Sequence, residues 1–501
     1  MIEERQILTT DLERVKDFFV DPRNPQSAED LVQIGGDAIR VMAQIYSTAG
    51  QIESMPPKFR DWLQGIKPGM SELESVTGEV LRMEAKTRRF DEMFMGQIHP
   101  QGSKIGIISN LVAAYMNNNL IVEDVSQSER VMERESIRWL AEILGYETDL
   151  AGGNIVTGGT EANEIALMVA REKLLDSMGL KNPLKRVKNP VQMYVLTSRW
   201  KHYSISKKCD ELGIGLLEMP SDDFKINVRA TEKAVRKLRE RGKHVVAIVG
   251  LAGETETGAI EDLEGLAEVA HNTDIYFHVD AAYGGPFVLS RRKDLFKGIE
   301  YADSVTIDPH KMLYTPYPAG AIVFRNASDQ DYLHTDTRYL GAVASTSSGS
   351  RSTAGTISTY ATIKLLGNDG IATLLNHTLD LVETAYHYVE DSRVLRALHE
   401  PELNTMLIGL TDDVKTRAAQ RGIDGKAYDD MICAVIRQID NHRSRNPYVS
   451  NNSDVDPEKR FGRIGKRSVF RFIAVHPYTT HEDVRTTLQR VEETVSEKIG
   501  L

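Results

Sequence analysis

The stretch that decides the fold is Ser304–Lys311, SVTIDPHK, in which a short apolar run ends in Asp-Pro-His-Lys. A second stretch, Tyr276–Gly285, YFHVDAAYGG, has the same design and carries Asp280 where its apolar run ends. Short apolar runs with β-branched residues are typical of buried strands in a parallel sheet. Ligands of such sheets bind beyond the carboxyl ends of the strands. We therefore expect Lys311 and Asp280 to face one site.

The chain around these two stretches alternates between strand-like and helix-like segments. This alternation predicts an α/β fold whose mostly parallel sheet is covered on both faces. The expected strands are Gln192–Thr197, His244–Ala252, Ile275–Asp280, Ser304–Ile307 and Gly320–Phe324. The expected helices between them include Glu161–Asp176, Ala230–Arg241 and Leu263–His271.

Three regions of the chain differ in their pattern of apolar and polar residues. Residues 1–95 are polar with helix-like apolar spacing, and we expect an N-terminal helical segment there. Residues 96–366 carry the alternating pattern and are expected to form the large domain. After a polar turn predicted at Gly367–Gly370, residues 367–501 are expected to form a smaller α/β domain, with a strand at Val469–Val475 and a closing helix at His481–Ile499.

Composition excludes several classes of protein. The 501 residues are 41% hydrophobic and 27% charged, which is ordinary for a globular chain and unlike a disordered one. With 61 basic and 72 acidic residues the net charge is −11, so nucleic acid is not an expected partner. Two cysteines, Cys209 and Cys433, suffice for neither a disulfide framework nor a zinc site, so no metal is expected. Because we find no secretory signal and no membrane-length apolar run, we expect a cytoplasmic protein without a membrane partner.

Four motifs in the large domain carry chemistry that fits together. Lys311, at a strand end beside His310, is expected to have a lowered pKa and to act as a nucleophilic amine. Asp280 is followed by small residues and, if buried, needs a cationic partner such as a protonated pyridine nitrogen. The glycine-rich run Gly152–Asn163 precedes a helix and suits a phosphate, and His202 follows a strand where it could stack on an aromatic ring. Together these motifs predict a pyridoxal-phosphate site.

From about Met95 to its C-terminus the chain resembles the group II pyridoxal-phosphate-dependent amino-acid decarboxylases. The resemblance implies the aspartate aminotransferase-like fold (fold type I), with a mostly parallel sheet in the large domain, a smaller C-terminal α/β domain, and pyridoxal 5'-phosphate as the cofactor. Within the group, Thr306–Gly320 and Gly349–Arg351 look most like bacterial tyrosine decarboxylases and their archaeal tyrosine/aspartate relatives. The motifs that carry the resemblance are Thr157–Asn163, His202–Ser204, Ala252–Thr255, His278–Gly284 and Asp308–Lys311.

The resemblance implies a role for each matching residue at the cofactor. Lys311 forms the internal aldimine, and Asp280 pairs with the pyridine nitrogen. The ring lies between His202 and the methyl group of Ala282, and Thr255 supports the ring substituents or Asp280. The implied phosphate contacts are Gly158, Gly159, Thr160 and His310, with Ser350 supplied by a partner subunit.

Decarboxylation of an L-amino acid is the activity that the resemblance implies. After carbon dioxide leaves, Cα must be protonated, and Tyr332 and Tyr339 are the candidates because such enzymes commonly use a tyrosine on a mobile loop. The substrate stays open between an aromatic amino acid such as tyrosine and an acidic one such as aspartate or glutamate. His99 is the candidate contact for the substrate carboxylate, and Arg351 could pair with an acidic side chain.

Three other functions remain open at this point. An aminotransferase of the same fold could use Arg471 to bind the α-carboxylate of its substrate. An aldehyde lyase or a non-catalytic scaffold are the others, although a scaffold would not require Lys311, Asp280 and His202 together. Active sites of this fold are built at a dimer interface, so the resemblance also implies a homodimer in which residues 1–95 wrap around the partner.

Overall fold

The computed structural model describes most of the chain from residue 92 onward. The described residues are 11–36 (apart from 22, 30, 31 and 34), 92–181, 191–337, 342–344, 346–440 and 469–500. Most of the N-terminal segment expected over residues 1–95, and with it the expected wrapping of a partner, lies outside the described residues.

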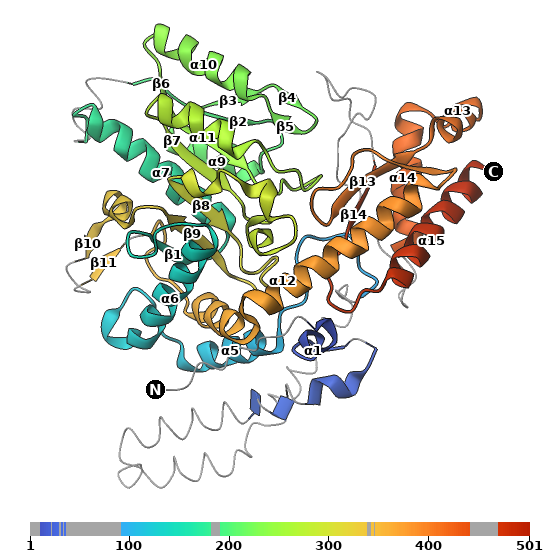
Figure 1. The fold of residues 1–501 in the computed structure, drawn as a ribbon, viewed down its shortest axis with the longest axis horizontal. Coiled ribbons are helices and arrows are strands. Elements are labelled where there is room, and N and C mark those ends of the chain that lie inside the picture. The colour runs from blue at the N-terminus through green and yellow to red at the C-terminus, as the bar shows by residue number, and fades with distance from the viewer. Residues whose placement is uncertain are drawn as a thin grey trace, which may run out of the picture.

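A seven-stranded sheet forms the centre of the large domain (Figure 1). Strand β9 runs antiparallel to both of its neighbours, and the other strands of the sheet are parallel to one another, so the expectation of a mostly parallel sheet is confirmed. In spatial order the strands are β1 (Gly152–Val156), β9 (Gly320–Phe324), β8 (Ser304–Ile307), β7 (Tyr276–Asp280), β6 (His244–Leu251), β2 (Met193–Ser198) and β3 (Gly215–Met219).

Helices cover both faces of this sheet because successive strand residues point to opposite sides. On one face, α7 (Gly159–Ser177) and α9 (Tyr203–Leu212) pack against residues such as Val195 and Val249. On the other, residues such as Ile248 and Val279 meet α6 (Gln127–Ile143), α10 (Val228–Glu240) and α11 (Leu263–Asn272). The helices and strands expected from the alternating pattern are therefore present, with bounds that differ by a few residues at most.

Strand β1 was not expected, because its sequence GGNIV was interpreted as part of a phosphate-binding loop. In the structure Gly152 and Gly153 belong to the strand, which pairs antiparallel with β9. A Cβ atom on Gly153 would lie 2.1 Å from the carbonyl oxygen of Ile322. The glycine therefore serves the close approach of two strands, and the loop that faces the site begins only at Thr157.

The long helix α12 (Ala354–Glu390) connects the two domains, as its diagonal course in Figure 1 shows. Only Gly367 leaves the helical conformation, at φ 59° and ψ −175°, so the predicted polar turn at Gly367–Gly370 is a kink within the helix. The smaller domain has its own core around an antiparallel sheet, as expected for a second α/β unit. Its elements are β12 (Leu395–Ala397), β13 (Thr405–Leu410), β14 (Phe470–Ile473), α13 (Asp412–Gln420), α14 (Gly425–Asp440) and α15 (His481–Ile499).

The remaining elements are short, apart from α5 (Lys104–Met116), which packs along α12. Helix α1 (Leu12–Lys16) also packs on α12, and the Tyr478 hydroxyl donates to the carbonyl oxygen of Lys16 at 2.7 Å. Among the described residues, we find no helix with the length and apolarity needed to cross a membrane. The other elements are β4 (Ser221–Asp222), β5 (Lys225–Ile226), β10 (Thr335–Thr337), β11 (Ala342–Ala344) and 3₁₀ helices at Pro25–Ala28, Glu123–Val125, Gly285–Leu289, Lys293–Phe296, Ile299–Tyr301 and Ala327–Leu333.

Candidate active site

A cavity of about 430 Å³ opens where β6, β7 and β8 end and where α7 and α9 begin. This is the edge of the sheet at which the strand-end residues were expected to meet. Nine of the residues expected at the cofactor lie in its wall: Gly158, Gly159, Thr160, His202, Thr255, Asp280, Ala282, His310 and Lys311. The wall also contains Ile98, Thr157, Glu161, Asn163, Trp200, Tyr203, Leu251, Gly253, Glu254, Tyr283, Asp308 and Tyr317.

Lys311 forms an ion pair with the carboxylate of Asp308 in the wall of this cavity. Its Nζ lies 2.9 Å from Oδ2 of Asp308, and both side chains are largely buried. Burial opposes the charged form of the lysine, but the carboxylates of Asp308 and Asp280 outweigh that effect and raise the pKa of Lys311. The sequence led us to expect a lowered pKa, on the basis of the neighbouring His310. That histidine is not a cation, because burial and the charge of Lys311 lower its pKa to about 3.

The start of α7 forms a cradle for an anion. The first N–H groups of a helix have no partner within the helix and carry its positive dipole end. A Cβ on Gly158 would lie 3.3 Å from Cε1 of His310, and one on Gly159 would lie 3.0 Å from Oδ2 of Asp308. Glycine at both positions therefore leaves space beside the helix start. The carboxylate of Glu161 turns back onto Thr157, whose N–H and hydroxyl donate to it at 3.0 and 2.8 Å.

Asp280 and His202 are connected through the interior of the protein. Oδ2 of Asp280 accepts a hydrogen bond from the Asn163 side-chain amide at 2.8 Å, and Oδ1 accepts one from the backbone N–H of Ala282 at 3.2 Å. His202 is the N-cap of α9, and its Nδ1 lies 2.8 Å from the hydroxyl of Ser204. Burial lowers the pKa of His202, so the imidazole is neutral at pH 7.

Tyr317 joins His310 and His99 in an aromatic group at the cavity. Its ring stacks on His310 with centroids 3.7 Å apart and an angle of 23° between the planes. His99 meets the edge of Tyr317 at 5.2 Å but does not itself belong to the cavity wall. Tyr317 was missed because it lies in a loop with no periodic pattern, and its contact with His310 depends on the course of the chain after Lys311.

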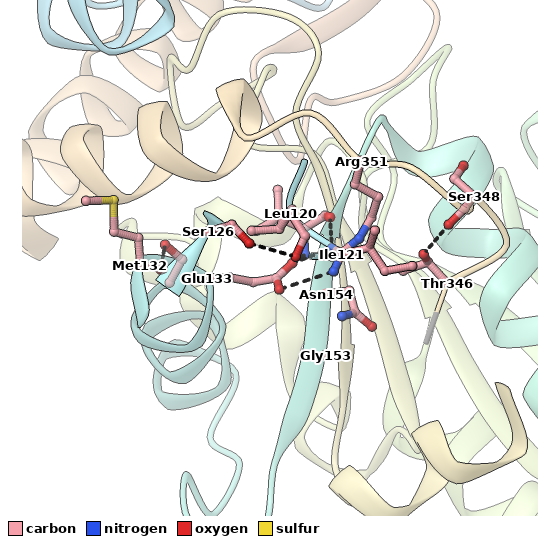
Figure 2. A network of polar contacts seen from close by, with 12 residues as sticks. Leu120, Ile121, Ser126, Met132, Glu133, Gly153, Asn154, Thr346, Ser348 and Arg351 are labelled. Atoms are coloured by element: carbon pink, nitrogen blue, oxygen red, sulfur yellow. Dashed lines mark hydrogen bonds and ion pairs between the residues drawn. The ribbon is translucent and has the colours of Figure 1, made fainter. Parts of the chain in front are cut away.

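The structure places Arg351 and Ser350 outside the cavity wall. Figure 2 shows the Arg351 guanidinium beside Glu133 of α6, with Nη1 2.5 Å from Oε1, and the same nitrogen donates to the carbonyl oxygen of Ile155 at 2.9 Å. Arg351 therefore does not reach a substrate in the cavity of its own chain, contrary to expectation. Ser350 is exposed, and its hydroxyl accepts a hydrogen bond from Asn119 at 3.2 Å.

The tyrosines expected to protonate the substrate differ in how the structure describes them. The Tyr332 hydroxyl donates to Asp176 at 3.3 Å, and the residue does not belong to the cavity wall. Tyr332 is thus a poor candidate in its own chain, whereas Tyr339 lies outside the described residues. Arg471, considered for an aminotransferase, instead donates to the carbonyl oxygen of Thr255 at 3.2 Å and lies 3.5 Å from Glu256.

Asn163 and Glu254 were also missed as parts of the cavity wall. Asn163 lies three residues after Thr160 on α7, so helical spacing alone would have put the two on one face. Glu254 is 5% exposed, and burial raises its pKa to about 7. Its carboxylate accepts hydrogen bonds from the backbone N–H of Glu256 at 2.9 Å and from both the N–H and the hydroxyl of Thr257. These bonds stabilise the loop after β6 from within.

These residues fit pyridoxal phosphate. The wall supplies an amine on Lys311, a buried carboxylate on Asp280, a flat neutral ring on His202 and a glycine cradle at a helix start. Among the residues that the structure describes, the buried Oδ1 of Asp308 has no hydrogen-bond partner, which leaves an acceptor in the wall for a ligand group that donates a hydrogen bond. Fold and site together define a pyridoxal-phosphate enzyme of fold type I.

The comparisons with known proteins give the family. The family description "Pyridoxal-dependent decarboxylase conserved domain" matches residues 55–407. A probable L-tyrosine/L-aspartate decarboxylase of Methanothermobacter thermautotrophicus is 34% identical over 307 residues, which are 58% of this chain and 76% of the relative. An L-aspartate decarboxylase of Thermococcus kodakarensis is 31% identical over 353 residues, which are 66% of this chain and 84% of the relative. The chain therefore belongs to the pyridoxal-phosphate-dependent amino-acid decarboxylases.

Solved structures agree on the fold. The Oryza sativa TDC with PLP and tryptamine has a TM-score of 0.76 at 19% identity, covering 96% of this chain and 99% of that one. The glutamate decarboxylase domain of a Vibrio parahaemolyticus enzyme has a TM-score of 0.73 at 20% identity, covering 97% and 99%. Fold type I and pyridoxal phosphate as the cofactor, both expected from the sequence, are confirmed. Neither the aminotransferase nor the aldehyde-lyase alternative is favoured.

Proposed function

We propose that this decarboxylase acts on an aromatic L-amino acid such as tyrosine. The observation that carries the proposal is the aromatic character of the cavity wall, which contains Trp200, Tyr203, Tyr283 and Tyr317. An arginine, the usual partner of a substrate carboxylate side chain, is absent from the wall as far as the described residues form it. An acidic substrate is the second candidate, because relatives at 31–34% identity are named for aspartate.

The proposed roles of the residues follow from their chemistry and position. When bound, pyridoxal phosphate supplies a conjugated ring that takes up the electron pair left at Cα as carbon dioxide departs. Lys311 attaches the cofactor, and Asp280 keeps a proton on the ring nitrogen by offering it a carboxylate. His202 and Ala282 border the ring, and Thr255 supports either the ring substituents or Asp280. The N–H groups of Gly158, Gly159 and Thr160, together with His310, bind the phosphate.

Three further roles are proposed for residues that do not belong to this cavity wall. Ser350 is exposed, which suits the expected phosphate contact with the site of a partner subunit. Because the Tyr332 hydroxyl is hydrogen-bonded to Asp176, we propose Tyr339 as the residue that donates a proton to Cα. His99, at the edge of Tyr317, is proposed to approach the substrate carboxylate.

The test is the release of carbon dioxide and amine from each common L-amino acid by purified protein with added pyridoxal phosphate. We expect tyramine from tyrosine, and no product with Lys311→Ala, which lacks the amine that attaches the cofactor. Release from aspartate or glutamate alone would replace the aromatic substrate by the acidic one. If no amino acid is decarboxylated while borohydride still traps the cofactor on Lys311, the proposed substrate classes are wrong.

We further propose that the protein acts as a homodimer in the cytoplasm. Leu111 and Tyr115 on α5 and Val131 on α6 are exposed apolar side chains on two helices that both pack against α12, and a second copy of the chain would cover them. Leu111→Arg together with Tyr115→Arg is expected to give a monomer by analytical ultracentrifugation. Leu150→Arg, a change of another exposed leucine outside this patch, is the control and should stay dimeric. The cytoplasmic location is supported by Cys209 and Cys433, which form no disulfide.

A further inference from the structure

Asn163 lies at the centre of a buried hydrogen-bond network that reaches both sides of the cavity. The residue is 1% exposed and lies about one turn into α7, just beyond the glycine cradle. Its side-chain nitrogen is 2.8 Å from Oδ2 of Asp280 and 3.1 Å from the hydroxyl of Ser204. Its side-chain oxygen is 2.7 Å from the hydroxyl of Thr306 and 3.0 Å from Nε2 of His278.

The direction of each bond in this network is determined by chemistry. A carboxylate can only accept hydrogen bonds, so Asp280 must face the amide nitrogen of Asn163 and not its oxygen. The oxygen of Asn163 then accepts from Thr306 and from Nε2–H of His278. His278 is fully buried, and burial lowers its pKa to about 4, so it is neutral and carries its proton on Nε2. Its Nδ1 lies 2.8 Å from the hydroxyl of Ser304 and 3.1 Å from the carbonyl oxygen of the same residue, and with the proton on Nε2 it accepts from the hydroxyl.

The same reasoning determines which nitrogen of His202 carries a proton. Ser204 receives one N–H of Asn163 on its oxygen, so its own hydroxyl hydrogen can point to Nδ1 of His202, 2.8 Å away. The backbone N–H of Ser204 also donates to Nδ1, at 3.3 Å. Nδ1 therefore accepts, and the proton of the neutral imidazole is on Nε2. A hydroxyl freed from Asn163 could rotate to another acceptor and weaken this preference.

We propose that Asn163 is a positioning residue that orients the carboxylate of Asp280 for the cofactor ring nitrogen and holds His202 as its Nε2–H tautomer. The proposal rests on the function proposed above, since it assigns the roles of Asp280 and His202 at the cofactor. The proposal also connects two parts of the cofactor site through one helix, α7. The first turn of α7 carries the glycines and Thr160 proposed for the phosphate and, three residues on, the amide that orients the group proposed for the opposite end of the ring. Asn163 acts through Asp280 and Ser204, and we assign it no chemical step.

The decisive variant is Asn163→Asp, which preserves the shape of the side chain but replaces its two N–H donors by an ionisable carboxyl group. The new carboxyl group faces Asp280 and cannot satisfy it when ionised. We expect the Kd of pyridoxal phosphate, measured by absorbance titration, to rise roughly tenfold or more. In the cofactor-free protein labelled with ¹⁵N-histidine, we expect the imidazole spectrum of His202 to change from the Nε2–H tautomer to a mixture. The His202 signals are assigned by their loss in His202→Gln.

Asn154→Asp is the matched control, because Asn154 is also a buried asparagine of the large domain, and its oxygen accepts from Gln330 at 2.8 Å, outside the cavity wall. This control is expected to retain the wild-type Kd and His202 spectrum. If Asn163→Asp folds and keeps both as well, the proposal is overturned. Should it fail to fold, Asn163→Ser, which keeps one donor, is measured instead, and an unchanged Kd and tautomer there would also contradict the proposal.

The readouts separate this inference from the proposed function. Neither cofactor binding nor the histidine spectrum requires a substrate. If the wild-type protein decarboxylates tyrosine but Asn163→Asp leaves both readouts unchanged, only the role of Asn163 fails. If the variant loses cofactor affinity while the wild type decarboxylates no amino acid, only the proposed function fails.

Discussion

At the scale of single residues, the charge state of Lys311 is decided by Asp308. An amine attacks the aldehyde of a cofactor only as the free base, and the carboxylate 2.9 Å away stabilises the ammonium form, which raises the pKa of Lys311. Before the cofactor arrives the site therefore holds Lys311 as an ammonium group paired with Asp308. The cost is that covalent attachment requires Lys311 to give up a proton.

Asp308→Asn tests this account. Removal of the carboxylate lowers the pKa of Lys311, so the amine becomes a free base at lower pH. We expect the pH midpoint for the borohydride-trapped adduct, measured by mass spectrometry after brief exposure to cofactor, to move to lower pH. Asp149→Asn, at an exposed aspartate paired with Arg138, should leave the midpoint unchanged. An unchanged midpoint in Asp308→Asn would show that Asp308 does not govern this lysine.

Arg351 is the second residue of interest at this scale, because the structure places it in a buried ion pair with Glu133. Both Arg351 and Glu133 have side chains about 11% exposed, and removal of one partner leaves the other charge buried. We expect Arg351→Ala to lower the free energy of unfolding by about 3 kcal/mol in urea titrations. Arg138→Ala, which breaks an exposed pair with Asp149, should cost less than about 1 kcal/mol. A stable Arg351→Ala protein with a raised KM for aspartate alone would restore the substrate role.

The contrast among these residues shows what a single sequence reveals about a site. Asp280 ends a strand and Lys311 and His202 each follow one, and the ends of parallel strands meet at one edge, so their convergence could be predicted. Arg351 could not be distinguished from a substrate ligand, because it lies in a loop and its partner Glu133 lies in α6, far away in sequence. Asn163 and Tyr317 acquire their roles from side-chain contacts with Asp280 and His310, which no local pattern encodes.

At the scale of helices and strands, the hydrophobic pattern was sufficient to predict the bounds of those elements that are buried apolar runs. The predicted strands Ser304–Ile307 and Gly320–Phe324 have the same bounds in the structure because each is a fully buried apolar run. Strand β1 was missed because its glycines indicate a loop, although Gly153 is required by the close approach of β9. Helix α12 was divided for a similar reason, since Gly367–Gly370 has the composition of a turn.

The kink at Gly367 gives a prediction at this scale. With φ 59° and ψ −175° the residue occupies a region that is essentially restricted to glycine, and a Cβ there would meet no atom of the described residues within 4 Å. Gly367→Ala is therefore expected to lose about 1–3 kcal/mol of unfolding free energy through backbone strain alone. Gly349→Ala, also without an atom within 4 Å but at an ordinary φ, should have little effect. Equal stability of the two variants in urea titrations would contradict a strained kink.

At the scale of the whole molecule, two hydrophobic cores are joined by buried polar groups that are neutral at pH 7. His377 of α12 lies 3.0 Å from the carbonyl oxygen of Thr479, and His476 follows β14; both are buried. Burial lowers the pKa of His377 to about 4 and that of His476 to about 3, below the ordinary value of 6.5. The folded protein thus binds fewer protons than the unfolded chain as the pH falls below that value.

This difference sets the direction of the pH dependence of stability. The contribution of each histidine is complete above pH 6.5 and is lost as the pH falls toward 4, at about 1.4 kcal/mol for each unit between the two pKa values. We expect the urea midpoint of the wild-type protein to fall steadily from pH 7 to pH 5. His377→Gln, whose side chain can still donate to Thr479 but does not titrate, should reduce that slope, whereas His334→Gln, at an exposed histidine, should not. A slope that is the same in all three proteins would mean that His377 does not contribute to the pH dependence of the stability.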